Sequence, residues 1–485
     1  MCGFISIFGP EGKDVVQDVL SGLLAIQHRG QDAAGVVTFK DKFQEKKGLG
    51  LVREVFERRH LRRLRGNMAV GHVRYPTVGL GEATDVQPFQ VPYPVGIAMA
   101  HNGNVTNFHQ LKTEYFAERH VRLGSNCDLE AVLYVFADRL MRREGSRITP
   151  EDVAAATAEV FGKVRGAYSV VGIIAGFGMY AFRDPYGIKP CIFGKRTTTE
   201  GVHYACASES VVLDVAGYEV VRDLRAGELM WIGQDRQPHF VQVGDAPHRP
   251  CIFEYIYFAR PDAVLDGVSV YNARIVLGKR LARAWKATGL EIDVVIPVPE
   301  SARTAGQALA EELDVPYREG FVKNRYVGRT FIMPNDRERQ DSIRHKLNPI
   351  RAEFEGKRVL ILDDSIVRGN TSRQIVRIAR QMGATKVYLA SYSPPLVHPC
   401  LYGIDMATKR EFVARDRTME EIAAQLGADR VFYQTIDDMV AGVREAGARD
   451  VEFCKACFDG VYPTGDITER MLSDIEADRI QAARR

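Results

Sequence analysis

The stretch VLILDDSIVRGNTSRQ, residues 359–374, constrains the fold of this chain more than any other. An apolar run indicates a buried strand, and two adjacent acids, Asp363 and Asp364, follow at its carboxyl end. A short polar loop then leads into a helical pattern. Strands and helices alternate at this spacing from about residue 275 to 395, which predicts a parallel sheet covered by helices.

The same stretch predicts a phosphate site. Free backbone N–H groups, hydroxyls and a helix N-terminus form a cradle for a phosphate group, and paired carboxylates hold ribose hydroxyls or Mg²⁺. The cradle residues are Arg368, Gly369, Asn370, Thr371 and Ser372. The alternative is a strand end followed by a capped helix, which any α/β protein can contain, but adjacent acids directly before such a loop weaken it.

Two further stretches complete a diphosphate site. IPVPESARTAG, residues 296–306, follows a second strand, and its Ser301 can add an oxygen ligand to Mg²⁺. KNRYVGRTFI, residues 323–332, offers cations that include Lys323 and Arg329, as a lid over a diphosphate would, although in isolation it reads as a solvated loop. Together these stretches resemble type I phosphoribosyltransferases, which bind 5-phosphoribosyl-1-diphosphate (PRPP).

The chain begins MCGFISIFG, and removal of Met1 would make Cys2 the first residue. Its thiol and α-amine would then form a nucleophile with its own base, because an α-amine titrates near pH ~7.7 to 8.0. The alternative is an ordinary cysteine in an edge strand.

Other polar residues of the first half complement a glutamine attacked at its side-chain amide. Arg74 can grip an α-carboxylate, Asn102 and the N–H of Gly103 can form an oxyanion hole, and Asp128 can pair with an α-ammonium. Singly, HNG reads as a turn and Asp128 as a helix cap. Together with IQHRGQDAAG and FRDPYGIKP they resemble the glutaminase domain of N-terminal-nucleophile amidotransferases.

Of the eight cysteines, four lie in stretches that look placed for a metal: Cys251, Cys400, Cys454 and Cys457. The CxxC spacing of the last pair is common in sites where two thiolates bind one soft metal. Four thiolates suit either zinc or an iron–sulfur cluster. Cys127, Cys191 and Cys206 are expected in or near the core.

Length predicts two domains, and the balance of charges argues against a partner that binds through bulk charge. At 485 residues the chain is longer than a single hydrophobic core usually supports. It has 65 basic and 62 acidic residues, and this near balance argues against nucleic acid or membrane partners. The sequence has neither an apolar membrane span nor a signal peptide, so we expect a cytoplasmic protein. We place an α+β glutaminase domain at 2–235, an α/β phosphoribosyltransferase domain whose C-terminal region carries the CxxC pair at 250–465, and a helical tail at 466–485.

With both halves present, the chain resembles the amidophosphoribosyltransferases, specifically their iron–sulfur subgroup. The resemblance implies a four-layer αββα first domain and the first committed step of de novo purine nucleotide synthesis, in which glutamine-derived ammonia displaces diphosphate from PRPP. It also implies Mg²⁺, a structural [4Fe–4S] cluster on the four cysteines, a homotetramer, and inhibition by purine nucleotides. Subgroup members often carry a propeptide, whereas Met1 alone precedes Cys2 here, so we do not expect autocatalytic processing.

Two other functions remain as alternatives. A PRPP-binding regulator without catalysis would have little need for Cys2, Arg74, Asn102 and Asp128 together. A purine-salvage phosphoribosyltransferase would need a nucleobase site and no glutaminase half. Release of glutamate from glutamine separates both from an amidotransferase.

Overall fold

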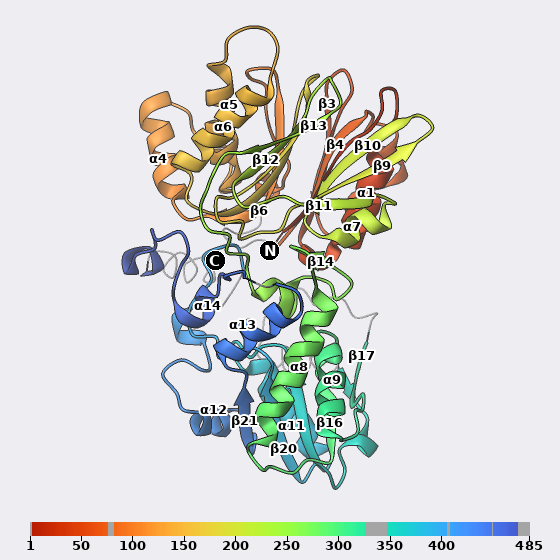
Figure 1. Ribbon diagram of the computed structural model, residues 1–485, viewed down its shortest axis with the longest axis vertical. Helices are drawn as coiled ribbons and strands as arrows, with labels where there is room; N and C mark the ends of the chain where they lie inside the picture. The colour runs from red at the N-terminus through yellow and green to blue at the C-terminus, as the bar shows by residue number, and fades with distance from the viewer. Residues whose placement is uncertain (1, 76–81, 325–346, 405–407, 449, 474–485) are drawn as a thin grey trace.

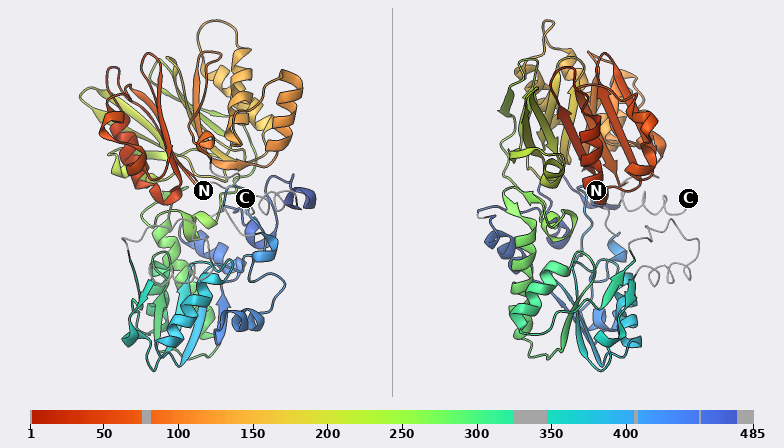
Figure 2. Two further views of the ribbon diagram at one scale, coloured as in Figure 1. Left: turned by 180° about the vertical axis from the view of Figure 1, so that it is seen from behind. Right: turned by 90° about the vertical axis from the view of Figure 1, so that its right-hand side faces the viewer.

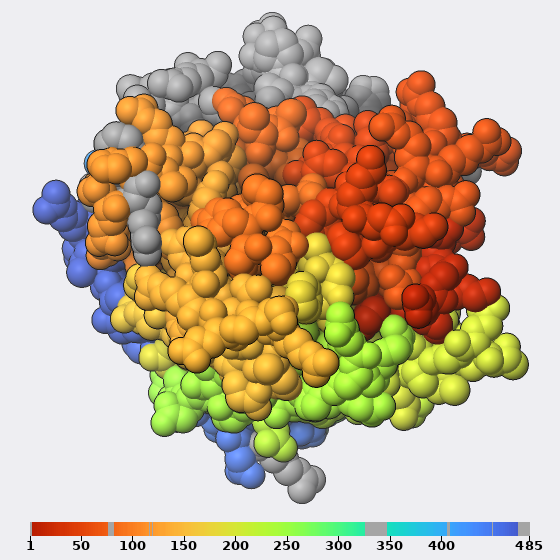
Figure 3. Space-filling view, turned by 90° about the horizontal axis from the view of Figure 1, so that it is seen from above, coloured from red at the N-terminus to blue at the C-terminus, as the bar shows by residue number. Residues whose placement is uncertain are grey.

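The computed structural model describes residues 2–75, 82–324, 347–404, 408–448 and 450–473, and shows two units stacked along the long axis of the molecule (Figure 1). The first unit contains two antiparallel sheets, and the second contains a parallel sheet. Views from behind and from the side show that the chain's N-terminal end lies where the units meet (Figure 2). From above, the first half of the chain forms most of the visible face, and C-terminal residues reach only its rim (Figure 3).

The sheets of the first unit pack face to face. The seven-stranded sheet has the order β11-β9-β10-β1-β4-β2-β3 and the six-stranded sheet the order β13-β12-β8-β7-β6-β5. The first consists of β1 (Gly3–Phe8), β2 (Ala33–Phe39), β3 (Phe43–Leu49), β4 (Met68–Arg74), β9 (Ile192–Thr198), β10 (Gly201–Ala207) and β11 (Glu219–Asp223). The second consists of β5 (Phe89–Val91), β6 (Ile97–Val105), β7 (Gly166–Ile174), β8 (Gly178–Arg183), β12 (Glu228–Ile232) and β13 (Pro238–Gln242).

Apolar residues on the facing sides of both sheets form one core, which includes Phe4 and Val70 from the first sheet and Ala100 and Val171 from the second. Helices cover the outer faces, so the unit has the expected four layers. These helices are α1 (Val16–Ala25) and α7 (Ser210–Val215) on one side, and α4 (Phe108–Arg119), α5 (Leu129–Met141) and α6 (Pro150–Lys163) on the other. Shorter helical segments are η1 (Gln27–Arg29), α2 (Val52–Val55), α3 (Arg58–Leu61) and η2 (Ala83–Asp85).

One sequence expectation and one of the alternatives differ from the structure in this unit. Strand β13 pairs with β12, so the sheet continues past the expected boundary at residue 235 to Gln242, and the connection is shorter than predicted. Strand β1 lies between β10 and β4, so the residue before it, Cys2, does not begin an edge strand.

A connecting segment joins the units. It contains a π-helix, η3 (Glu254–Phe258), and a small hairpin of β14 (Val264–Leu265) and β15 (Val268–Ser269). Arg183 of β8 pairs with Asp266 in the hairpin turn, with Nη2 and Oδ2 2.8 Å apart, and so ties the connection to the first unit.

The second unit is built on four parallel strands in the order β16-β19-β20-β21. Alternate residues of β19 face opposite sides: Leu360 and Leu362 belong to the core that includes α8, α9 and α13, whereas Val359 and Ile361 belong to the core with α11 and α12. Burial on both faces explains the continuous apolar run of this strand. The elements are α8 (Val270–Lys286), β16 (Val294–Pro297), α9 (Arg303–Leu313), β17 (Phe321–Lys323), β18 (Leu347–Pro349), η4 (Arg351–Glu353), β19 (Arg358–Asp363), α11 (Asn370–Gln381), β20 (Lys386–Ser391), η5 (Lys409–Glu411), α12 (Met419–Leu426), β21 (Arg430–Tyr433), α13 (Ile436–Glu445) and α14 (Ala456–Asp459).

The C-terminal segment returns to the first unit. Thr106 donates a hydrogen bond from Oγ1 to Asp466 Oδ2 over 3.0 Å, and residues 469–473 are helical. Beyond them, the predicted tail lies outside the described residues. In the described ranges, no helix is both long and apolar enough to span a membrane.

Candidate functional site

The predicted nucleophile lies at the junction of the two units. Cys2 is buried directly before β1, its nitrogen is 3.4 Å from Asn102 Oδ1, and its Sγ is 3.8 Å from the carbonyl oxygen of Tyr75. The sheets bring these residues together, because β1 pairs with β4, which ends at Arg74, while Asn102 lies on β6 of the other sheet.

Asn102 leaves a buried donor available. Its side chain is fully buried, and within the described ranges its Nδ2 has no hydrogen-bond partner. A buried unpaired amide costs free energy unless something completes it, and an oxyanion beside Cys2 would do so. The next residue, Gly103, lies in β6 rather than in a turn, and a Cβ there would be 2.1 Å from the carbonyl oxygen of Ala167, so only glycine fits.

Sequence reasoning missed the residue that holds Arg74. The guanidinium of Arg74 is 3.6 Å from Asp85 Oδ2, and both side chains are buried. The other oxygen of Asp85 accepts a hydrogen bond from the N–H of Asn126 over 3.0 Å. Asp85 therefore orients the cation predicted to grip an α-carboxylate, but a single acid at the end of the short helical segment η2 carries no sequence signal for this role.

Asp128 caps helix α5 and also binds residues near the predicted oxyanion hole. Its Oδ1 accepts from Leu129 N over 3.1 Å, and its Oδ2 accepts from Val105 N over 2.7 Å. His101 Nε2 is 3.3 Å from Oδ1. Burial raises the pKa of Asp128, but the His101 charge and hydrogen bond and the Val105 N–H outweigh it, so the pKa lies below its usual value and the carboxylate stays ionised.

The second predicted site lies at the carboxyl ends of β16 and β19. Asp363 ends β19, and Asp364 follows it and accepts hydrogen bonds from Ser301 Oγ and from Ser365 Oγ, the latter over 2.7 Å. Burial and the neighbouring Asp364 charge raise the pKa of Asp363 well above its usual value, and burial also raises the pKa of Asp364. Two buried carboxyls that repel each other favour a bound cation, so the donor set with Ser301 fits Mg²⁺.

The predicted phosphate loop leads directly into α11. Gly369 precedes α11 with φ of 74°, and a Cβ there would be 2.7 Å from Leu426 Cδ2, so conformation and space both require glycine. Ser372 is buried, whereas Asn370 and Thr371 are exposed in the first turn of α11. The Arg368 side chain points to Glu411, with Nε 3.1 Å from Oε1, so its backbone rather than its charge contributes to the cradle here.

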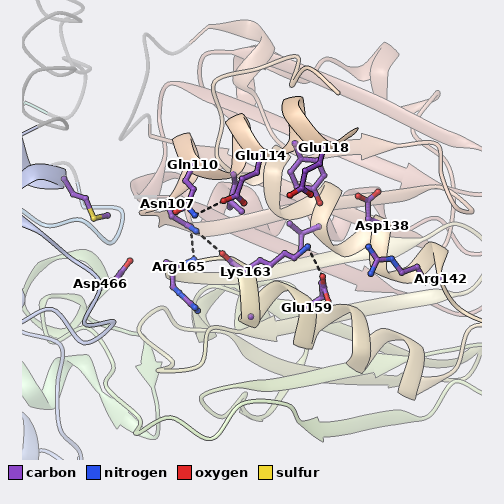
Figure 4. Close-up of a pocket in the computed structure, with 15 residues that line it drawn as sticks. Asn107, Gln110, Glu114, Glu118, Asp138, Arg142, Glu159, Lys163, Arg165 and Asp466 are labelled. Atoms are coloured by element: carbon purple, nitrogen blue, oxygen red, sulfur yellow. Dashed lines mark hydrogen bonds and ion pairs between the residues drawn. The ribbon is translucent and has the colours of Figure 1, made fainter. Parts of the chain in front are cut away.

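The predicted lid is described only at its beginning. Lys323 ends β17 and is exposed, and Arg329 lies outside the described residues. A separate surface cavity is lined by residues of α4, α5 and α6 and by Asp466 (Figure 4), and it contains none of the predicted site residues.

The four cysteines predicted to bind a cluster are buried and come together at the junction. Ile252 N donates to Cys454 O over 3.1 Å, Cys454 N donates to Pro250 O over 2.9 Å, and His398 N donates to Cys457 O over 3.1 Å, which ties their segments together. Burial raises the pKa of Cys251 to about 12, and the charges of Cys400 and Cys251 add to burial in raising the pKa values of Cys454 and Cys457.

The chemistry of this donor set fits a tetrathiolate site, because all four thiols are free and a metal displaces their protons on binding. As the side chains stand, however, no three His, Cys, Asp or Glu residues in the described part of the chain form a group that could hold a metal ion. The cluster therefore stays a prediction. Cys127, Cys191 and Cys206 are buried in core clusters, as expected.

Comparisons with known proteins match both units. The glutamine amidotransferase domain model matches residues 72–214, and the phosphoribosyl transferase domain model matches residues 270–392. The chain is 46% identical over 488 residues to the amidophosphoribosyltransferase of Pseudomonas aeruginosa, covering 100% of this chain and 97% of that protein. It is 43% identical over 489 residues to that of Saccharomyces cerevisiae, covering 99% and 95%.

A solved structure agrees with these relatives. The glutamine PRPP amidotransferase of Bacillus subtilis, solved with ADP and GMP, superposes with a TM-score of 0.85 at 36% identity, covering 96% of this chain and 98% of that one. Because relatives well above 30% identity span the whole chain and the fold matches along both units, this chain belongs to the amidophosphoribosyltransferase family.

Proposed function

We propose that this chain catalyses the reaction for which its family is named, the first step of purine biosynthesis, in which glutamine-derived ammonia displaces diphosphate from PRPP to give 5-phosphoribosylamine. The observation that carries the proposal is the buried arrangement of Cys2 beside Asn102, whose Nδ2 has no partner among the described residues. The regulatory alternative has weaker support, because a PRPP sensor needs no such arrangement and the curated relatives are named as transferases.

In the first half-reaction, the Cys2 sulfur attacks the carbon of the glutamine carboxamide as its own α-amine takes the thiol proton. Asn102 Nδ2 and Gly103 N–H stabilise the tetrahedral oxyanion. The α-amine then returns this proton to the amide nitrogen as the C–N bond breaks, so that neutral ammonia leaves. Water hydrolyses the resulting thioester to glutamate and restores the Cys2 thiol. Arg74 and Asp128 hold the α-carboxylate and α-ammonium of the substrate.

In the second half-reaction, ammonia attacks C1 of the ribose and diphosphate leaves. Asp363, Asp364 and Ser301 would hold Mg²⁺, which neutralises diphosphate charge when bound. The loop from Arg368 to Ser372 binds the 5-phosphate, and Lys323 and Arg329 contribute to a lid. Ammonia must stay unprotonated to react, so a dry passage between the sites is part of the proposal.

The junction between the units supports such a passage. A Cβ on Gly403 would be 2.8 Å from the carbonyl oxygen of Gly103, so the second unit lies against the backbone of the predicted oxyanion hole. Ammonia released at Cys2 thus starts beside the second unit.

The finer features are also proposals. Cys251, Cys400, Cys454 and Cys457 would hold a [4Fe–4S] cluster whose role is structural. We propose purine nucleotides as inhibitors, because the Bacillus subtilis neighbour was solved with ADP and GMP, and a homotetramer from the family resemblance. Eight free cysteines support a reducing compartment, the cytoplasm.

The deciding experiment measures glutamate release from glutamine by purified protein with and without Mg-PRPP. We expect release that Mg-PRPP stimulates, accompanied by diphosphate formation. In Arg74→Ala, KM for glutamine should rise while ammonia-dependent synthesis of phosphoribosylamine survives. Absence of glutamate release from wild type, or loss of both activities together in Arg74→Ala, contradicts the proposed division of labour.

A further inference from the structure

Three buried charges meet where the two units join. Arg29, in η1 of the first unit, donates from Nη2 to Glu254 Oε2 over 2.6 Å and from Nε to Glu209 Oε1. The side chains of Arg29 and Glu209 are 0% exposed and that of Glu254 is 2% exposed. Charges are rarely buried so completely unless they are paired, and removing one partner leaves the other uncompensated.

One side of Arg29 lies against the predicted glutamine site. A Cβ on Gly3, the residue after Cys2, would be 3.2 Å from Arg29 Cδ. A Cβ on Gly30, the residue after Arg29, would be 2.5 Å from the backbone nitrogen of Arg74. Residues 29 and 30 therefore pack against the start of β1, directly after Cys2, and against the end of β4 at Arg74.

The other side of the ion pair leads toward the predicted PRPP site. Glu254 begins the π-helix η3, an element often found at functional sites. Tyr392 OH donates to the carbonyl oxygen of Ile256 over 2.8 Å and also lies 3.3 Å from the carbonyl oxygen of Ser301. Ser301 in turn donates to Asp364.

A buried arginine also holds the π-helix in place. Arg274 of α8 donates from Nε to Tyr255 O over 3.1 Å and from Nη2 to Ala259 O over 2.9 Å. The π-helix thus lies between the buried charges and the acids that would receive Mg-PRPP.

We propose that Arg29 and Glu254 are positioning residues that couple occupancy of the PRPP site to the geometry at Cys2. This inference rests on the proposed function. A ligand that shifts Ser301 and Tyr392 would shift the π-helix, and the buried pair cannot separate without exposing uncompensated charge, so the displacement passes to the strand after Cys2. Substrate at the second site thereby improves the first.

The test uses Glu254→Gln, which keeps the shape of the side chain and removes its charge. Glutamate release is measured with and without Mg-PRPP, and phosphoribosylamine synthesis is measured with ammonia as nitrogen donor. We expect basal glutamate release and ammonia-dependent synthesis to stay within about threefold of wild type, while stimulation by Mg-PRPP falls about tenfold or more, the range of typical coupling between sites. A variant that keeps full stimulation overturns the proposal.

Asp266→Asn is the matched control. Asp266 pairs with the buried Arg183 across the same junction but contacts neither Arg29 nor Glu254 through a hydrogen bond, and its φ of 48° suits asparagine. We expect this variant to lower the unfolding temperature and keep the stimulation. Equal loss of stimulation in both variants would show that docking in general, and not this ion pair, couples the sites.

Arg29→Lys provides a second variant if Glu254→Gln does not fold. Lysine keeps the charge but lacks the fork that reaches two carboxylates. Stimulation by Mg-PRPP should fall in Arg29→Lys as well. In the variant that combines Arg29→Lys with Glu254→Gln, stimulation should fall no further than in the more affected single variant, because both substitutions act through one contact. Multiplicative losses would overturn the proposal. Wild type that hydrolyses glutamine without stimulation would overturn this inference alone, and wild type without glutaminase would overturn the proposed function as well.

Discussion

The side-chain amide of Asn104 donates a hydrogen bond to the carbonyl oxygen of Leu401 over 2.9 Å, which ties β6 to the second unit. Asn104 directly follows the predicted oxyanion-hole residues, and Leu401 directly follows Cys400. The predicted cysteine site and the predicted glutamine site therefore lie next to each other at the junction of the two units.

Asn104→Ala should loosen this junction between the units and allow ammonia to escape to water. We expect phosphoribosylamine formed per glutamate released to fall to about half or less, since ammonia that reaches water becomes ammonium. Both products are quantified in the same assay. Asn107→Ala is the control, because Asn107 donates to Lys163 O within the first unit over 2.9 Å. An unchanged ratio in Asn104→Ala contradicts the prediction.

Cys2→Ala should lower glutamine hydrolysis by about 1,000-fold or more, since no other group replaces the nucleophile. Ammonia-dependent synthesis should persist, which shows that the protein is folded. Cys127→Ala is the matched thiol control: burial and the Asp128 charge raise the pKa of Cys127, so it is a poor nucleophile. Glutamate release that survives in Cys2→Ala, measured by an enzymatic glutamate assay, would refute this assignment.

Asp363→Asn should lower ammonia-dependent synthesis by about 100-fold or more, because one of the paired metal-binding carboxylates is lost. Glutamate release without PRPP should continue. Asp293→Asn serves as control, because Asp293 binds Arg358 N at the opposite end of the sheet over 2.6 Å. If Asp363→Asn retains its Mg²⁺-dependent rate, the acids do not bind the metal.

Glu209 should contribute stability that disappears in acid. Burial raises its pKa, but the Arg29 charge and the His28 contact outweigh burial and bring the pKa to about 2, from an ordinary value of 4.5. The native state then binds fewer protons than the unfolded state, so the contribution is complete above pH 4.5 and is lost as the pH falls toward 2. In urea unfolding, the advantage of wild type over Glu209→Gln should shrink by about 3 kcal/mol across that window. A constant difference would contradict the shift.

Protein purified without oxygen should contain iron and sulfide in equal amounts, with the broad visible absorption of an iron–sulfur cluster. Cys457→Ser should lose most of both, whereas Cys191→Ser, which changes a buried thiol of the first unit's core, should keep them. Zinc without sulfide would identify the other metal that four thiolates suit.

Much of the second unit was predictable from local pattern. The apolar run before Asp363 predicts a strand that is buried on both faces, and the loop that ends at Ser372 predicts the start of a helix. Both features depend on residues that are adjacent in the chain. The first unit was less predictable: HNG reads as a turn, but strand pairing placed Asn102 and Gly103 in β6, and β13 extended the sheet to Gln242.

By itself, the sequence determined the two-unit organisation, the acidic strand end, the phosphate loop and the residue types able to attack and hold glutamine. Each of these features depends on residues that lie close together in the chain. Only the tertiary structure placed Asp85 beside Arg74, left Asn102 Nδ2 without a partner in the described chain, and joined Arg29 to Glu254 across the units. These contacts connect residues distant in the chain, and burial decides their strength. Neither property is present until the sheets and the two units have packed together.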